Sequence, residues 1–578
     1  MSAPRANTLI ASPALRRVRA ALRSPVIFNS MLLAALLITF LVASMQVRAY
    51  AGGVARDSFT LRGSIPTPVL RYTPPESARL PVVAVVAHGY AASKEIMSAF
   101  AVDLAKQGVT VYTFDFPGHG ASTAYYGGLT HDHVVDQLVS ALGEVVDYAT
   151  AHAPPHAKVV LLGYSLGTIA VGEYALRHPE MSNLSATVLV AGILKDKPTP
   201  TTPRNLLVLS GQFDLPGIND IARDAIAAAC ATPARMIHGT TYQCATSATD
   251  ARRQVILPGL DHISIVTAAS THAAVIQWLG ATVDPHIGKT PVNADTRLHW
   301  MLLGFVAALL AVAPLVRLLS LALRLRPARD DATLPSADSD GADGRRAGGL
   351  PGWLGFGALA GALGLALLAL LAALPTSFWG PDPFPFTFLH QQVSADVAIF
   401  FLFAGALLAA ALWGAPRLRA WIALPSWRET GWQVAIAAVV TVFLTLTLGG
   451  LSTFAWESLA LEPQRLWRGA VYALMLWPFF FGLRSLLRAM APRLRYPWLA
   501  DLGASALIIA ALVGAIVMNF GRLSYLGILL PIVIILLLLF AAFSAFARRM
   551  LWHPVALVAT LEAFLLAWVL SATLPLVA

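Results

Sequence analysis

The chain has 578 residues, of which 57% are hydrophobic and only 12% are charged. Soluble globular chains carry roughly 25% charged residues, so this composition excludes an ordinary soluble protein and indicates a membrane protein. The formal net charge is +10. The distribution of basic residues described below accounts for that charge without a nucleic-acid partner.

A basic amino-terminal stretch, residues 1–25, precedes the first long apolar run, Val26–Met45. About 20 apolar residues are enough to cross a bilayer and are more than a typical signal-peptide core contains. The following segment, Gln46–Tyr50, is a mediocre cleavage site. We therefore expect an uncleaved transmembrane signal anchor at 26–45, with a cleaved signal peptide as the alternative.

Short apolar runs then alternate with helical patterns. The predicted strands include Pro81–Val86, Val109–Phe114 and Val159–Leu162, and the predicted helices include Lys94–Gln107 and Asp132–His152. Alternation of this kind predicts an α/β fold, a mostly parallel sheet with helices on both faces.

The third run leads directly into Gly163-Tyr164-Ser165-Leu166-Gly167. A buried strand that ends in Gly-x-Ser-x-Gly and precedes a helix is typical of a nucleophile elbow, where side chains at the two glycine positions would clash. The first run ends in His88-Gly89-Tyr90, and the second is followed by Asp115–Ser122. With these motifs, the chain from roughly Asp57 to Val283 resembles the α/β-hydrolase superfamily, more narrowly its lipase, esterase and serine-aminopeptidase-like branch.

A serine nucleophile needs a base, and the base needs an oriented acid. The resemblance implies the chain order serine, acid, histidine. Asp214 and His262 each follow a predicted strand after Ser165, so we expect these three residues to form a catalytic triad. Asp220 is the nearest substitute if Asp214 instead caps a helix, and His262 has the alternative of a surface-loop residue. Asp261 is expected to be a solvated loop charge.

The main-chain N–H of Leu166, at the start of the elbow helix, should donate one hydrogen bond to the oxyanion of a tetrahedral intermediate. The resemblance implies that the N–H of Tyr90 donates the other. We expect His119 to be a structural turn residue, and His131 and His133 to mark a helix start rather than a metal site. No cofactor or metal is expected.

The chain departs from many α/β hydrolases in having only Leu194–Asn205 where they carry a helical lid. It is instead extended between the predicted acid and base, and that extension holds both cysteines, Cys230 and Cys244. We expect them to form a disulfide that staples a flap beside the site, with two unrelated thiols as the alternative.

Apolar runs of spanning length recur after this region. We predict eight further spans near His299–Leu319, Trp353–Leu374, Ala395–Trp413, Trp432–Leu451, Ala470–Leu487, Leu499–Met518, Leu526–Phe546 and Val555–Leu574. The sequence thus predicts a hydrolase domain at 50–290 and an all-α transmembrane bundle at 296–578.

Basic residues accumulate in short cytoplasmic loops. With the amino terminus in the cytoplasm, the short outside loops carry only Arg465, Arg468 and Arg522, and the remaining loop arginines lie inside. This orientation places the hydrolase domain outside the cytoplasm and makes 327–350 a disordered cytoplasmic loop. The abundance of Ala, Leu and Arg is typical of a GC-rich bacterial genome, so a bacterial inner membrane is expected.

Two features of the predicted bundle have both a functional and a plain interpretation. The outside loop Thr376–Gln392 is rich in aromatic residues, which usually mark the membrane interface but would also suit lipid steering towards Ser165. Glu562 lies inside the last span, where an ionisable residue is either functional or paired with an arginine of a neighbouring helix.

The sequence therefore predicts a membrane-anchored serine hydrolase that cleaves carboxylic esters through an acyl-enzyme, with lipid-like esters among its candidate substrates and membrane lipids around it. Three alternatives stay open. The same triad suits an acyltransferase, or a peptidase or amidase. From a different class, the spans would transport or sense a compound and the outer domain would only bind.

Overall fold

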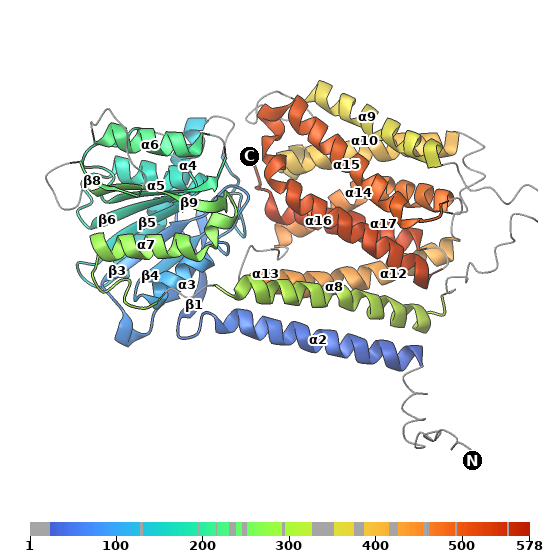
Figure 1. Ribbon diagram of the computed structural model, residues 1–578, viewed down its shortest axis with the longest axis horizontal. Coiled ribbons are helices and arrows are strands. Elements are labelled where there is room, and N and C mark those ends of the chain that lie inside the picture. Colours follow the sequence, from blue (N-terminus) through green and yellow to red (C-terminus); the bar gives the residue numbers. More distant parts are fainter. Residues whose placement is uncertain are drawn as a thin grey trace, which may run out of the picture.

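In the computed structural model, the chain forms an α/β part and a bundle of long helices that lie side by side (Figure 1). The structure describes residues 24–127, 131–192, 194, 196–215, 217–230, 239–244, 251–291, 295–325, 352–374, 387–414, 426–454, 459, 462–491, 494–551 and 554–577. The predicted loop at 327–350 and most of the aromatic loop at 376–392 lie outside these residues.

The α/β part contains one twisted sheet. Its described strands are β1 (Ala55–Arg62), β2 (Pro66–Thr73), β3 (Val82–Ala87), β4 (Thr110–Phe114), β5 (Lys158–Tyr164), β6 (Leu184–Val190), β7 (Leu206–Phe213), β8 (Thr241–Gln243) and β9 (Ala251–Asp261). They follow the spatial order β1-β2-β4-β3-β5-β6-β7-β9-β8. The six central strands, β4, β3, β5, β6, β7 and β9, pair in parallel, and β1, β2 and β8 are antiparallel additions at the edges.

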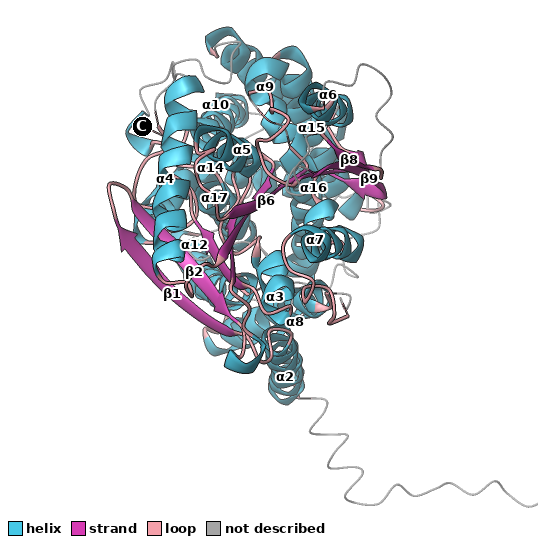
Figure 2. Cartoon of the chain, turned by 90° about the vertical axis from the view of Figure 1, so that its left-hand side faces the viewer, coloured by secondary structure: helices cyan, strands magenta, loops and turns pink. Residues whose placement is uncertain are grey.

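Helices cover both faces of this sheet, as the alternation of runs predicts. They are α3 (Ser98–Lys106), α4 (His131–Ala151), α5 (Leu166–Arg177), α6 (Ile218–Ala229) and α7 (Ala269–Thr282). Side chains of α3 and α7 form the apolar core on one face, and those of α4, α5 and α6 form the core on the other. Figure 2 shows the strands between α4 on one side and α3 and α7 on the other.

The boundaries of α3 differ from the predicted helix Lys94–Gln107. Lys94 and Glu95 are not helical because the buried Lys94 ammonium pairs with Asp115, and its main-chain N–H donates to the same carboxylate at 2.8 Å. A tertiary contact therefore replaces the first helical turn that the apolar pattern suggests. The hairpin β1–β2 was also missed, since β1 is largely exposed and lacks an apolar run.

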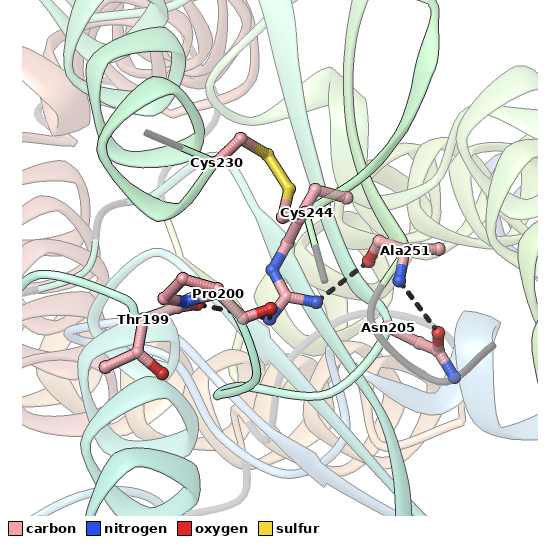
Figure 3. Close-up of a disulfide and its surroundings, with 7 residues drawn as sticks. Thr199, Pro200, Asn205, Cys230, Cys244 and Ala251 are labelled. Carbon is pink, nitrogen blue, oxygen red and sulfur yellow. Dashed lines mark hydrogen bonds between the residues drawn. A yellow bond between two sulfur atoms is a disulfide. The ribbon is translucent and has the colours of Figure 1, made fainter. Parts of the chain in front are cut away.

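Cys230 and Cys244 form the predicted disulfide, but the expectation of a flap beside the site was wrong. Cys244 directly follows β8, whose Gln243 pairs with Ala251 at the beginning of β9, whereas His262 follows the end of β9. Eleven extended residues separate these two ends, roughly 30 Å. Figure 3 shows the disulfide beside Thr199, Pro200 and Asn205.

The bundle contains the predicted apolar spans. The long helices are α2 (Pro25–Ala49), α8 (Arg297–Ala322), α9 (Gly352–Ala373), α10 (Gln392–Gly414), α12 (Trp427–Leu444), α14 (Pro463–Met490), α15 (Trp498–Met518), α16 (Phe520–Met550) and α17 (Val555–Thr573). Helix α12 continues through a π-helical turn, Thr445–Gly449, into α13 (Gly450–Ser452). Among the described residues, nine segments are long and apolar enough to cross a membrane.

Glu562 of α17 pairs with an arginine, which was one of its two predicted roles. Its carboxylate is fully buried and accepts hydrogen bonds from the Arg484 guanidinium of α14, one of them at 2.8 Å. Arg484 also donates to Asp501 of α15, which in turn accepts from Arg548 of α16. Opposite charges thus compensate one another where four helices meet, which reduces the cost of burying them.

The α/β part packs on one end of the bundle. The loop after β3 contributes Ala91 to the main apolar cluster of the bundle, and the turn after β4 bonds to Leu576. Because both loops leave the carboxyl ends of their strands, this edge of the sheet faces the helices. Helices α2 and α8 enter and leave the α/β part and lie side by side (Figure 1).

We predict that the double substitution Cys230→Ser/Cys244→Ser lowers the stability of the α/β part by about 3 kcal/mol, because the cross-link closes a loop of about 15 residues. The thermal unfolding midpoint of the purified chain in detergent measures this effect. Reduced wild-type protein should show the same shift, and an unchanged midpoint in both samples would contradict the prediction.

Candidate active site

Ser165 occupies a tight turn between β5 and α5. Its main chain has φ 51° and ψ −115°, a conformation that non-glycine residues rarely adopt. A Cβ at Gly163 would overlap the carbonyl of Gly167, and one at Gly167 would overlap the carbonyl of Ala87. The two glycines of the motif are therefore required by close backbone contacts, and they keep Ser165 at the carboxyl edge of the sheet.

Three side chains from separate strand ends meet at this edge. His262 Nε2 lies 3.0 Å from Ser165 Oγ, and His262 Nδ1 lies 2.6 Å from Asp214 Oδ1. Because a carboxylate only accepts hydrogen bonds, the proton of a neutral His262 lies on Nδ1. Nε2 then accepts from the serine hydroxyl, which is the arrangement a general base requires.

Asp214, rather than the alternative Asp220, is the carboxylate that reaches the imidazole. The Asp214 side chain is fully buried, and its oxygens accept from the main-chain N–H groups of Leu215 at 2.8 Å and Gly211 at 3.3 Å. Asp220 lies in the first turn of α6 and pairs with the exposed Arg223. These two main-chain donors hold the Asp214 carboxylate in place beside the imidazole.

The loop that carries His262 is fixed on both sides. The Tyr164 hydroxyl donates to the His262 carbonyl at 2.9 Å, so the residue before the serine also holds the histidine. Asp261 is exposed, as expected, but it also accepts from the main-chain N–H groups of Ser264 and Ile263. The N–H of Ser264 holds the pKa of Asp261 below its usual range. Neither restraint was predicted from the sequence.

Residues 88–92, here called the oxyanion loop after the role predicted for Tyr90, lie directly against Ser165. A Cβ at Gly89 would come within 3.1 Å of Ser165 Cβ, so the main chain entering Tyr90 touches the elbow. Leu166 is the first residue of α5, where main-chain N–H groups have no partner in the preceding helical turn. The structure thus brings both predicted oxyanion donors close to Ser165.

His88 and Asp115 connect the oxyanion loop to the segment after β4. His88 is buried, its Nδ1 lies 2.7 Å from the Gly89 carbonyl, and its Nε2 accepts from the Phe116 N–H at 3.1 Å. Asp115 accepts from Lys94 Nζ at 2.6 Å and from the Ala121 N–H at 2.9 Å. Burial lowers the pKa of His88 to about 4, so this histidine is neutral and cross-links the two loops.

The other singled-out histidines have structural positions. His119 is buried in the turn after β4, where its Nδ1 lies 2.9 Å from the Pro117 carbonyl, and burial lowers its pKa well below the usual value. Helix α4 begins at His131. No role was predicted for Lys94 or Asp115. The available signal was the position of Asp115 directly after a predicted strand, where a carboxylate often has a structural or chemical role.

Residues 80–214 match a protein family described as serine aminopeptidase, S33. No curated protein matches the chain. Similar solved structures include a protein assigned as a CIB-like hydrolase from Thermoplasma acidophilum, with 16% identity, covering 39% of this chain and 99% of that one, TM-score 0.29. A bacterial membrane phospholipase A is 16% identical; the match covers 46% of this chain and 96% of that chain, with a TM-score of 0.28. A protein assigned as a dienelactone hydrolase from Klebsiella pneumoniae is 18% identical; the match covers 39% of this chain and 97% of that chain, with a TM-score of 0.29.

The family match and the order of the sheet identify the α/β part as an α/β-hydrolase domain. Within this domain, residues 80–214 are similar to the S33 serine-aminopeptidase family. The same chain carries a bundle of helices that are long and apolar enough to span a membrane.

We predict that the hydrolase domain loses stability as the pH falls below neutrality. An unfolded chain protonates His88 near its ordinary pKa of 6.5, whereas the folded chain does so only at about 4. Between these values the unfolded state binds more protons, and this residue alone lowers the unfolding free energy by about 3 kcal/mol.

The thermal unfolding midpoint between pH 7.5 and pH 4.5 measures this loss. The variant His88→Gln should unfold at a lower temperature at pH 7.5 but depend less steeply on pH than the wild type. Equal pH dependence of the two proteins would contradict the assignment of the titration to His88.

Proposed function

We propose that the protein is a membrane-bound serine hydrolase that cleaves carboxylic esters through an acyl-enzyme. The observation that carries this proposal is the continuous hydrogen-bond chain from Asp214 through His262 to Ser165. Serine and imidazole within 3.0 Å form the pair that general-base activation of a hydroxyl requires.

In the proposed reaction, Ser165 Oγ attacks the ester carbonyl carbon and its proton passes to His262 Nε2. Asp214 stabilises the resulting imidazolium, and the N–H groups of Tyr90 and Leu166 bind the negative oxygen. The imidazolium then gives its proton to the departing alkoxide, which leaves an acyl-serine. His262 next takes a proton from water, and the resulting hydroxide attacks the acyl carbonyl carbon. As this second tetrahedral intermediate collapses, the bond to Ser165 Oγ breaks, His262 returns its proton to that oxygen, and the acid is released.

The environment of the site favours an apolar, lipid-like ester. The carboxyl edge of the sheet faces the bundle, so the proposed nucleophile lies on the side of the domain nearest the membrane-spanning segments. Two exposed apolar side chains flank the proposed acid, Phe213 with 66% and Leu215 with 41% of their surface accessible. Exposed apolar groups next to the proposed acid lower the free energy of an acyl chain that contacts them.

We further propose that the hydrolase domain lies outside the cytoplasm and that α2 remains as a signal anchor. Helix α2 packs along α8, as expected for a retained first span. Its amino-terminal end follows the basic stretch, and the opposite end joins the hydrolase domain. A disulfide between Cys230 and Cys244 fits an oxidising compartment.

We predict that Ser165→Ala abolishes both fluorophosphonate labelling and ester hydrolysis, because no other hydroxyl is expected to replace the nucleophile. Asp214→Asn should lower kcat by on the order of 10⁴-fold, since an amide allows the unproductive imidazole tautomer. The measurements are gel-based labelling and turnover of a panel of soluble acyl esters and membrane lipids.

Asp220→Asn is the matched control, because Asp220 is exposed and lies outside the hydrogen-bond chain. It should keep activity within about twofold of the wild type. Equal labelling of wild type and Ser165→Ala would exclude Ser165 as nucleophile. Products that retain the acyl group on an added alcohol or amine, rather than on water, would make the enzyme a transferase.

We predict opposite accessibility for two exposed positions. A cysteine introduced as Ser64→Cys in the hydrolase domain should react with a membrane-impermeant maleimide on intact bacterial spheroplasts. One introduced as Arg428→Cys, near the beginning of α12, should react only after the membrane is permeabilised. The reverse pattern would place the hydrolase domain in the cytoplasm.

A further inference from the structure

Arg465, in the first turn of α14, joins the bundle to the hydrolase domain. Its side chain is 1% exposed. Nη2 donates to the Gly118 carbonyl at 2.8 Å and Nε to the Gly120 carbonyl at 3.0 Å, both in the hydrolase domain. Nη1 donates to the carbonyls of Ser571 and Leu574 at the end of α17, at 2.7 and 2.8 Å. Buried donors are costly to leave unpaired, so this guanidinium strongly favours the observed docking.

A short segment after α17, residues 574–577, contacts the same part of the hydrolase domain. The Leu576 N–H donates to the Gly118 carbonyl at 2.8 Å, and the Leu576 carbonyl accepts from the Tyr126 N–H at 2.7 Å. Gly118 has φ +76°, and a Cβ there would overlap the Leu576 carbonyl and Tyr126. Gln464, next to Arg465, donates to the Ser122 carbonyl at 2.6 Å. Helix α14 and this segment therefore hold residues 117–126, here called the β4–α4 turn.

The β4–α4 turn packs against the oxyanion loop through aromatic side chains. The ring of His119 packs against the rings of His88 at 5.2 Å and Tyr90 at 5.6 Å. Tyr126 packs against Tyr90 at 6.0 Å. Tyr90 itself contacts the apolar cluster of the bundle, and Ala91 has an unfavourable φ of 53°. A strained loop persists only where its surroundings fix it, and here the surroundings include the bundle.

We propose that the bundle completes the active site by holding the oxyanion loop, with Arg465 as the positioning residue. This inference rests on the proposed function, in which the Tyr90 N–H stabilises the oxyanion. Arg465 touches no reacting atom. It fixes the β4–α4 turn, the turn fixes His88 and Tyr90, and the main-chain donor is thereby preorganised for the transition state.

The test compares Arg465→Gln with Arg468→Gln in the full-length chain in detergent. Arg468 lies one turn further along α14, is 3% exposed, and donates to the carbonyls of Leu389 and Gln464 within the bundle. The measurements are kcat and KM for a soluble short-chain ester, the Ki of a trifluoromethyl-ketone transition-state analogue, and amide hydrogen exchange of residues 88–92.

For Arg465→Gln we expect kcat to fall about tenfold and the Ki to rise by a similar factor, with KM within about twofold, because the oxyanion contact forms mainly in the transition state. Exchange at residues 88–92 should accelerate. Arg468→Gln should match the wild type in all four measurements. A merely structural role would change the unfolding midpoint of both variants without this split between kcat and KM.

Unchanged kcat, Ki and exchange in folded Arg465→Gln would overturn the proposal, and so would equal losses in the two variants. If Arg465→Gln does not fold, a chain that ends at Pro575 removes the contacts of Leu576 and must show the same pattern. Failure of the proposed function would give a different result from failure of this inference. In that case wild type and Ser165→Ala would be labelled equally by the fluorophosphonate, while amide hydrogen exchange at residues 88–92 would still report whether the bundle holds the loop.

Discussion

The conformation of the main chain at Ser165 is the constraint on which the candidate site depends. A positive φ at a residue with a side chain costs of order 1–3 kcal/mol and persists only where neighbouring structure enforces it. Here β5 fixes one side of the turn and α5 the other, and the glycines let the carbonyls of Ala87 and Gly167 approach closely. The same turn brings Tyr164 to the His262 carbonyl, so Ser165 and His262 are positioned by one short segment.

Much of this arrangement is predictable from the sequence because its signals are local. Buried parallel strands are continuous apolar runs, and a glycine motif at the end of one of them marks the elbow. Asp214 and His262 follow from chain order, once each is found beyond a strand. The bilayer requires about 20 apolar residues for each span, so the helices of the bundle can be predicted equally well from the sequence.

The remainder depends on contacts between residues that are distant in the sequence. The exposed hairpin strand β1 has no apolar run, and the ion pair of Lys94 with Asp115 removes the expected first turn of α3. The position of the disulfide depends on the pairing of β8 with β9, which spacing between cysteines does not encode. In the sequence, Arg465 is one of three basic residues in the predicted outside loops. Its contact with Gly118 depends on how the hydrolase domain packs on the bundle, which the sequence does not indicate.

The contact between Arg465 and Gly118 has a consequence for biosynthesis. The two residues are 347 positions apart, so a ribosome completes the β4–α4 turn long before it makes α14, and residues 574–577 come later still. The hydrolase domain is therefore synthesised while its oxyanion loop lacks this support. Under the proposed roles of Ser165 and Arg465, full hydrolytic activity arises only after the late helices have assembled, and a nascent chain hydrolyses esters more slowly than the complete protein.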